Sequence, residues 1–208
     1  MITGIYVITD EELIPGRTHA DIARAALEGG ATVIQLRDKH ASDDYLIEAG
    51  REIRRLTSAA GALFIVNDRL EVALACDADG LHVGQGDRPA SEVRPLVKGR
   101  ILGVSVLDPD QAAKARDDGA DYLGVGPIFA TATKPDADPP TGLGMIEQAK
   151  RASGGLLIVA IGGINEANVA EVARAGADSA SVISAVVCAE DMAAATRRLV
   201  ELWSGSAH

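Results

Sequence analysis

Residues 109–125, PDQAAKARDDGADYLGV, contain one complete unit of the fold that the rest of the chain repeats. Alanine and charged residues predict a helix over Pro109–Asp117, and Asp108 before it can cap the first turn. The apolar run Tyr122–Val125 predicts a strand. Between them lies Gly119-Ala120-Asp121, in which the glycine suits a left-handed helix end. The stretch therefore predicts a helix that turns closely into a strand.

The same unit recurs along the 208 residues, and the Gly-Ala pair returns at Gly30-Ala31 and Gly176-Ala177. Short apolar runs rich in β-branched residues predict eight strands: Ile5–Ile8, Thr32–Leu36, Leu63–Val66, Gly80–His82, Ile101–Val104, Tyr122–Val125, Leu157–Ala160 and Ser179–Val182. Helices are expected at His19–Glu28, Ser42–Ser58, Leu70–Ala75, Ser91–Val97, Pro109–Asp117, Gly144–Ala152, Glu166–Ala175 and Asp191–Trp203. Such uniformly apolar strands are typical of strands buried on both faces.

Eight strand and helix units predict an α/β protein with a (β/α)8 TIM barrel, formed as a single domain over residues 1–208. Each unit has about 26 residues, near the minimum for a right-handed crossover. An open doubly wound sheet is the alternative, but no Gly-x-Gly-x-x-Gly turn follows the first strand. The stretch Gly126–Gly142 is too long for an ordinary connection, and we interpret it as an active-site loop.

Composition argues against several classes of protein. The formal charge of -10 disfavours binding to nucleic acid or to a membrane surface, since both need a basic face. One tryptophan, three tyrosines and two phenylalanines are too few for a platform that stacks bases. Two cysteines without a Cys-x-x-Cys pair predict a reduced, cytoplasmic protein. The expected partners are therefore small molecules, and a homo-oligomer is left open.

Polar residues follow the predicted strands, at the end of the barrel where the catalytic residues of this fold lie. Arg37, Lys39 and Lys134 are basic residues at that end of an acidic protein, which favours a phosphate or diphosphate ligand. Each of them taken alone is equally compatible with an ordinary surface charge. Gln35, Arg37 and Lys39 alternate along an extended segment, so all three can project towards the same side.

Two carboxylates and a glycine pair add to this set. Asp68 and Asp87 end neighbouring strands and could share Mg²⁺, although either could instead cap a helix. Gly162-Gly163 precedes a helix, and Ser184 ends the next strand, in the usual phosphate site of the fold. The glycine pair by itself could equally mark a tight turn.

Other tempting residues have simpler interpretations. His82 lies within a strand, and we expect it to be a packed or hydrogen-bonded core residue. We expect His19 and His40 to be exposed and Cys76 and Cys188 to be small core residues. No Ser-His-Asp or Cys-His arrangement stands at a useful spacing, so covalent catalysis has little support.

From Tyr6 to about Val187 the chain resembles the thiamine-phosphate synthase family. Seven short segments, in the family's order, carry the resemblance: Gln35-Leu36-Arg37-Asp38-Lys39; Asn67-Asp68-Arg69; Ala78-Asp79-Gly80-Leu81-His82-Val83-Gly84-Gln85 with Asp87; Gly103-Val104-Ser105; Gly124-Val125-Gly126-Pro127-Ile128-Phe129 leading to Thr131, Thr133 and Lys134; Ala160-Ile161-Gly162-Gly163-Ile164; and Val182-Ile183-Ser184-Ala185.

The resemblance implies a transferase of thiamine biosynthesis. Such an enzyme joins 4-amino-5-hydroxymethyl-2-methylpyrimidine diphosphate to 4-methyl-5-(2-phosphoethyl)thiazole, by a dissociative mechanism with a carbocation, and releases pyrophosphate and thiamine phosphate. The implied cofactor is Mg²⁺, held by Asp68 and Asp87. The implied residues for the pyrimidine diphosphate are Gln35, Leu36, Arg37, Asp38, Lys39, Asn67, Ser105 and Lys134, of which Arg37, Lys39, Ser105 and Lys134 are catalytic. Those for the thiazole phosphate are Thr131, Ala132, Thr133, Gly163, Ile183 and Ser184.

The chain departs from the family pattern at Ala132, where a polar residue is frequent, and Pro135–Thr141 is longer and richer in proline. Two other functions are compatible with the scaffold: a thiazole tautomerase, and a non-catalytic protein that binds thiamine phosphate. Retention of Asp68, Asp87 and Lys134 together favours the synthase over the tautomerase. No segment resembles a DNA-binding module, which weakens the case for a regulatory binder.

Overall fold

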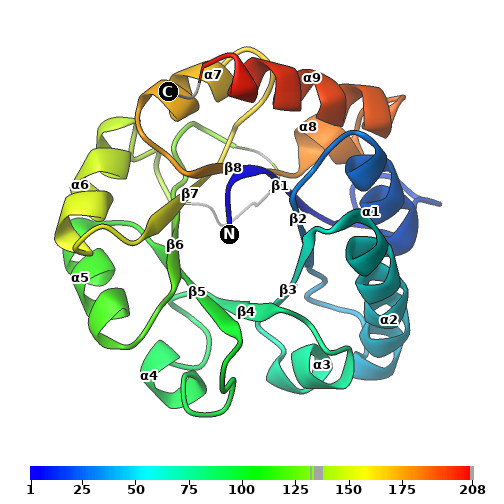
Figure 1. Cartoon of the computed structure of the whole chain (residues 1–208), viewed down its shortest axis with the longest axis horizontal. Helices are drawn as coiled ribbons and strands as arrows, with labels where there is room; N and C mark the ends of the chain where they lie inside the picture. Colours follow the sequence, from blue (N-terminus) through cyan, green and yellow to red (C-terminus); the bar gives the residue numbers. More distant parts are fainter. Residues whose placement is uncertain (132, 134–137, 207–208) are drawn as a thin grey trace.

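The strands form one closed ring with the helices outside it (Figure 1). A computed structural model describes residues 1–131, 133 and 138–206 of the chain. The strands are β1 (Gly4–Ile8), β2 (Val33–Leu36), β3 (Leu63–Asn67), β4 (Gly80–Val83), β5 (Ile101–Val106), β6 (Tyr122–Val125), β7 (Leu157–Ile161) and β8 (Ser179–Val182). Neighbours in sequence pair in parallel, and β8 pairs with β1 to complete the ring. The predicted (β/α)8 barrel is confirmed, and the open sheet is excluded.

The helices in the described residues are α1 (His19–Glu28), α2 (Asp43–Ala60), α3 (Leu70–Ala75), α4 (Ala90–Val93), α5 (Pro109–Asp117), α6 (Gly144–Ala152), α7 (Val169–Arg174), α8 (Ser184–Val187) and α9 (Met192–Ser204). Helix α4 is shorter than predicted, and Pro95 follows soon after its end. Helix α7 starts late because residues 166–168 form a turn, in which the Asn165 carboxamide accepts from the Ala167 N–H. Short α8, which directly follows β8, was not predicted.

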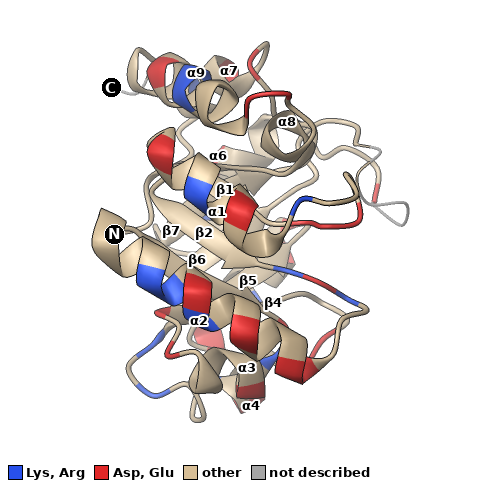
Figure 2. Cartoon of the chain, turned by 90° about the vertical axis from the view of Figure 1, so that its right-hand side faces the viewer, with Lys and Arg blue, Asp and Glu red and all other residues tan. Residues whose placement is uncertain are grey.

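Opposite charges lie close together on the outer helices, as Figure 2 shows along α2. Ion pairs link Arg55 to Glu52 on that helix and Arg24 of α1 to Glu52. Exposed pairs of this kind stabilise a fold by at most about 1 kcal/mol each. None of the described helices is both long and apolar enough to cross a membrane.

The predicted Gly-Ala junctions form the turns from helix to strand. Gly30, Gly119 and Gly176 have φ of 95°, 89° and 90°, the left-handed conformation in which a side chain would be strained. The following alanine N–H donates back into the helix, as from Ala120 to the Ala115 carbonyl. At the next position the Asp121 carboxylate accepts from the Leu102 N–H at 2.7 Å. The junction therefore joins each helix end to the start of the neighbouring strand.

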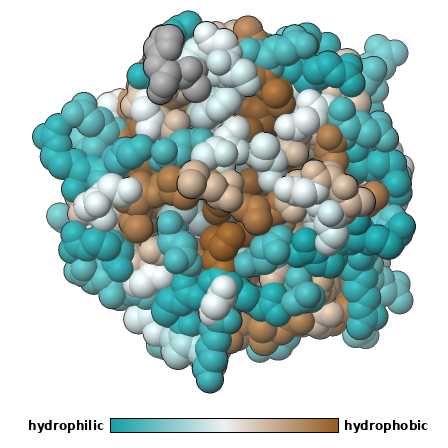
Figure 3. All heavy atoms as spheres, viewed as in Figure 1, coloured by the Kyte–Doolittle hydropathy of each residue, from teal (hydrophilic) through white to brown (hydrophobic). Residues whose placement is uncertain are grey.

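At the end of the barrel where β1 begins, Ile2 is only 2% exposed and packs with the apolar residues of the barrel interior. The N-terminus lies over the centre of the ring in Figure 1. In the same view, Figure 3 shows apolar atoms near the centre of this face and hydrophilic atoms around the periphery. This end of the barrel is therefore closed by apolar packing, and the polar residues after the strands lie at the other end.

Two strand glycines make room inside the barrel for large polar side chains. A Cβ on Gly103 of β5 would lie 2.1 Å from the Tyr122 ring and 2.4 Å from Nδ1 of His82. A Cβ on Gly124 of β6 would lie 2.9 Å from the His82 ring. Both distances are too short for real contacts, so the glycines allow Tyr122 and His82 to fill the interior.

We predict that Gly103→Ala destabilises the protein by about 3 kcal/mol, because the added methyl group overpacks the buried Tyr122 and His82. The matched control is Gly144→Ala at the exposed start of α6, where the nearest heavy atom to the new Cβ is the flexible end of Gln148 at 3.8 Å. This control should change the free energy of unfolding by less than about 0.5 kcal/mol. Chemical denaturation measures both values, and equal stability of the two variants would contradict the packing argument.

Candidate active site

The segment after β2 presents its side chains alternately to two sides, as the sequence predicts. Gln35 is buried inside the barrel, where its amide reaches Tyr6. Arg37 lies beside the Asp10 carboxylate, at an N–O distance of 3.6 Å. Leu36 instead packs in the apolar layer between strands and helices, so only its backbone is available to a ligand.

The Asp38 carboxylate is engaged by the turn that follows β2. It accepts from the backbone N–H groups of His40 and Ala41, at 2.7 and 2.8 Å, and lies 3.7 Å from Nε2 of His19. These hydrogen bonds lower the pKa of Asp38, although burial opposes them. The side chain of Asp38 therefore stabilises the turn that carries Arg37 and Lys39.

The two predicted metal ligands meet at a single ammonium group. The Lys39 ammonium forms an ion pair with Asp68 and lies 3.8 Å from Asp87. Asp68 has a left-handed backbone with φ of 60°, and its N–H donates to the His82 carbonyl at 2.9 Å. The Asp87 carboxylate accepts from the Gly84 N–H at 2.7 Å. Backbone hydrogen bonds at the ends of β3 and β4 thus fix the main chain of Asp68 and the carboxylate of Asp87.

The charges of this pair are strongly coupled. Burial and the neighbouring Asp87 raise the pKa of Asp68 to about 6, against the opposing effect of Lys39. Burial also raises the pKa of Asp87, but hydrogen bonds from Asp68 and the Gly84 N–H, with the Lys39 charge, outweigh it and leave that pKa lowered. Two half-buried carboxylates that share one cation, with Asp87 disfavouring the ionisation of Asp68, can accept a hard metal ion.

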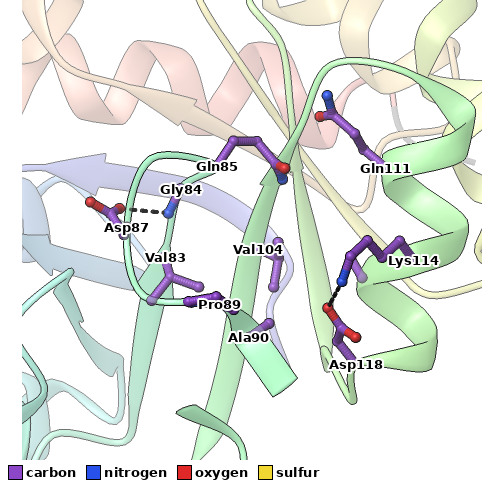
Figure 4. A pocket seen from close by; sticks show the side chains of 11 residues that line it. Val83, Gly84, Gln85, Asp87, Pro89, Ala90, Val104, Gln111, Lys114 and Asp118 are labelled. Atoms are coloured by element: carbon purple, nitrogen blue, oxygen red, sulfur yellow. Dashed lines mark hydrogen bonds and ion pairs between the residues drawn. The ribbon is translucent and has the colours of Figure 1, made fainter. Parts of the chain in front are cut away.

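A cavity of about 160 Å³ lies beside the carboxylates (Figure 4). Gly84, Gln85 and Asp87 form one wall of it, and Lys114 and Asp118 of α5 lie on the other side. The short segment 84–87 therefore lines this cavity and also carries Asp87 of the metal-ligand pair, and the hydrogen bond from the Gly84 N–H to the Asp87 carboxylate fixes its turn.

Ser105 lies within β5 and is half-buried. Its hydroxyl contacts Nε2 of His82 at 2.9 Å, and its carbonyl accepts from the Gln85 amide at 2.6 Å. His82 is 9% exposed and hydrogen-bonded, which confirms its interpretation as a core residue. Asn67 is the last residue of β3 and directly precedes Asp68 in the sequence. It is half-buried.

Three of the residues predicted for the second phosphate, Thr131, Thr133 and Ser184, lie together. The Thr133 hydroxyl donates to that of Ser184 at 3.1 Å, and the Thr133 N–H donates to the Thr131 hydroxyl. Ile183 precedes Ser184 at the start of α8. Among the described residues, no acceptor is bonded to the backbone N–H of Gly163 or Ser184. Hydroxyl and free N–H donors in one place suit an anion.

Segment 126–142 is anchored at its base. The Ile128 and Phe129 N–H groups donate to the carbonyls of Ile161 and Gly162, and the Thr141 N–H donates to the Pro127 carbonyl. Gly163 has φ of 65°, and a Cβ there would lie 2.4 Å from the Ala130 carbonyl oxygen. The glycine pair therefore serves close packing against this segment. Ala132 and Lys134 lie outside the described residues.

Two sequence expectations were wrong. His19 is fully buried rather than exposed, because its ring packs under Tyr45 and bonds through Nδ1 to the Thr9 hydroxyl at 2.8 Å. Cys188 is exposed, because the unpredicted helix α8 ends at it, whereas Cys76 is buried as predicted. His40 is exposed, as expected.

Asp10 was missed. It directly follows the apolar strand β1 and is 8% exposed beside Arg37. The rule applied to the other strands, that polar residues after a strand lie at the mouth, would have found it.

Known proteins resemble the chain over nearly its whole length. The family model described as thiamine monophosphate synthase matches residues 5–186. A thiamine-phosphate synthase from Chloroflexus aurantiacus is 55% identical, over 96% of this chain and 92% of that protein. One from Moorella thermoacetica is also 55% identical, over 95% and 94%.

A solved structure of a thiamine phosphate pyrophosphorylase from Pyrococcus furiosus superposes with a TM-score of 0.90 at 42% identity, covering 98% of this chain and 96% of that one. A 3-hexulose-6-phosphate synthase, at 19% identity and a TM-score of 0.63, shares the barrel fold alone. The closed parallel barrel, the order of the seven segments and the extent of the match lead to one conclusion: this chain belongs to the thiamine monophosphate synthase family.

Proposed function

We propose that the protein is a thiamine-phosphate synthase, a transferase that couples 4-amino-5-hydroxymethyl-2-methylpyrimidine diphosphate to 4-methyl-5-(2-phosphoethyl)thiazole. The observation that carries the proposal is the pair Asp68 and Asp87 sharing the Lys39 ammonium at the carboxyl end of the barrel. An acidic protein that gathers basic groups and a carboxylate pair in one place is suited to a diphosphate with a divalent metal. The membership of the family supports the same reaction.

The carboxylate pair fits Mg²⁺, which is commonly held by one or two carboxylates with water and substrate phosphate completing its shell. Asp68 and Asp87 would be its ligands, and a cation there would offset the burial and the Asp87 charge that raise the pKa of Asp68. The bound ion supplies neutralisation of the diphosphate charge. With a metal on the carboxylates, the Lys39 ammonium is free to pair with the diphosphate instead.

The proposed reaction needs charge stabilisation and positioning. The bond from the pyrimidine methylene carbon to the diphosphate oxygen breaks, and the electron pair leaves with pyrophosphate. Arg37, Lys39 and Lys134 offset that charge, while Gln35, Asn67 and Ser105 orient the pyrimidine that bears the cation. The thiazole nitrogen then donates its lone pair to the methylene carbon. No proton is transferred in this step, so no general base is required.

The thiazole phosphate is proposed to bind the hydroxyls of Thr131, Thr133 and Ser184 and the backbone N–H groups near Gly163 and Ile183. Neutral donors suffice here because a phosphate accepts several hydrogen bonds at once. Separate sites for the two anions place the thiazole on the opposite side of the mouth from the carboxylate pair. Ala132 stands where the family often has a polar residue, and an alanine side chain offers a phosphate no hydrogen bond.

The direct test is a coupling assay with both substrates, with Mg²⁺ and with chelator. We expect thiamine phosphate and pyrophosphate in equal amounts with Mg²⁺, and a loss of at least about 100-fold in rate with chelator, because the diphosphate charge is then unscreened. Unchanged turnover in chelator contradicts the metal site. Isomerisation of the thiazole alone, or ligand binding without turnover, contradicts the proposed reaction.

A second prediction concerns Asp68→Asn. Asparagine tolerates the left-handed backbone and removes a half-buried charge whose ionisation burial and the neighbouring Asp87 disfavour. The metal-free variant should therefore melt at a higher temperature than the metal-free wild type at pH 7.5, while its coupling activity is largely lost. Mg²⁺ should raise the Tm of the wild type but not that of the variant.

The increase in Tm with Mg²⁺ should also depend on pH. Because the pKa of Asp68 is about 6 in the metal-free protein, protons compete with the metal below that pH, and the increase should be smaller at pH 5.5 than at pH 7.5. The matched control is Asp77→Asn, the same change at an exposed left-handed residue at the end of α3. An equal Tm response to Mg²⁺ in wild type and Asp68→Asn would show that Asp68 is not a ligand.

A further inference from the structure

An unbroken chain of hydrogen bonds crosses the interior of the barrel. It runs from the Gln35 amide to the Tyr6 hydroxyl (2.7 Å), then to the Tyr122 hydroxyl (3.1 Å), to Nδ1 of His82 (2.8 Å), and from Nε2 of His82 to the Ser105 hydroxyl (2.9 Å). The two ends, Gln35 and Ser105, are residues that the proposed function assigns to the pyrimidine. The three residues between them have no role in that function.

The three residues in the middle of this series of hydrogen bonds are shielded from water. Tyr6 and Tyr122 are each 1% exposed, and both lie among the apolar residues of the barrel interior. Burial raises the pKa of both tyrosines above the usual value and lowers the pKa of His82 to about 4. All three groups are therefore neutral near pH 7. A buried neutral polar group needs a partner for each proton it carries.

Counting the protons shows that all the hydrogen bonds from Gln35 to Ser105 run in one donor-to-acceptor direction. The Gln35 amide nitrogen donates to the Tyr6 oxygen, so Tyr6 must donate to Tyr122. Tyr122 then donates to Nδ1 of His82, and the ring carries its proton on Nε2 and donates to Ser105. If Nδ1 carried a proton instead, in a neutral or a charged ring, Tyr122 would donate to Tyr6. The Tyr6 proton would then face no acceptor among the described residues.

This direction determines what each end can offer a ligand. Ser105 accepts from His82, so its own hydroxyl proton is free to be donated. One of the two N–H groups of Gln35 donates to Tyr6, which fixes the orientation of the amide, and its oxygen, which accepts no hydrogen bond from the described residues, is left to accept from a ligand. A 4-aminopyrimidine has the complementary pattern, since its amino group donates and the adjacent ring nitrogen accepts. A 4-oxo pyrimidine presents the reverse pattern, with an accepting oxygen and a donating ring N–H.

We propose that Tyr6, Tyr122 and His82 are positioning residues that make Gln35 an acceptor and Ser105 a donor, and so select an aminopyrimidine over its oxo analogue. The inference rests on the proposed function for the identity of the ligand. A site that fixes its donors and acceptors rejects a ligand with the reversed pattern, because buried polar groups are then left unpaired. Gln35 and Ser105 are the two ends of one series of hydrogen bonds. Neither end can therefore exchange its donor and acceptor roles without the other.

The test compares binding of the 4-amino and 4-oxo pyrimidine diphosphates, with Mg²⁺ and without thiazole, by isothermal titration calorimetry. The variants are Tyr122→Phe and Tyr6→Phe, which keep the ring packing and remove one hydrogen bond each. The matched control is Tyr45→Phe, an exposed tyrosine outside the barrel interior whose hydroxyl donates to Glu11. Wild type and control should prefer the amino ligand by at least about 100-fold. Each variant should narrow that preference by about tenfold, as expected for one hydrogen bond.

An unchanged preference in both folded variants, or the same narrowing in Tyr45→Phe, overturns the inference. Nitrogen NMR of the ligand-free protein gives an independent readout, with the His82 signals assigned by their absence in His82→Asn. A proton on Nε2 and a bare Nδ1 are expected, and a proton on Nδ1 overturns the stated direction. Wild type that fails to couple the two substrates overturns the proposed function, whereas normal coupling with an unchanged ligand preference in the variants overturns this inference alone.

Discussion

Closure of eight parallel strands into one ring is the constraint on which the rest of the structure depends. Each strand has neighbours on both sides, and β1 pairs with β8, so every carboxyl end lies at the same end of the barrel. Residues 35–39, 67–68 and 84–87 are far apart in the sequence, yet this closure brings them to one mouth. The carboxylate pair and the basic side chains beside it therefore follow from topology before any local interaction is considered.

The inside of the ring must be filled, and this chain fills part of it with polar groups. Tyr6, Tyr122 and His82 lie beside the apolar residues of the barrel core, and Gly103 and Gly124 provide space for Tyr122 and His82. Such groups are stabilising only when all their protons have partners. Because each buried proton needs an acceptor, the direction of these hydrogen bonds is fixed. Packing inside the barrel thereby determines which donor and acceptor atoms lie free at its mouth.

Much of the fold could be predicted because buried strands and the Gly-Ala junctions are local signals. Strand limits agree with the apolar runs to within about two residues, and Asp108 caps α5 as expected. Contacts across the barrel leave no such signal. Tyr6 and Tyr122 are 116 positions apart, and the burial of His19 depends on Tyr45 of another helix. The site residues were predicted from where strands end, but their partners, such as Asp10 for Arg37, required the folded arrangement.

The most direct measurement is a crystal structure with Mg²⁺, the thiazole phosphate and an unreactive analogue of the pyrimidine diphosphate. The account predicts a metal between Asp68 and Asp87 that also contacts the diphosphate, with Lys39 moved from the carboxylates to the phosphate oxygens. It also predicts the aminopyrimidine between the Gln35 oxygen and the Ser105 hydroxyl. A diphosphate bound away from this mouth, or a metal that contacts neither carboxylate, would contradict the account.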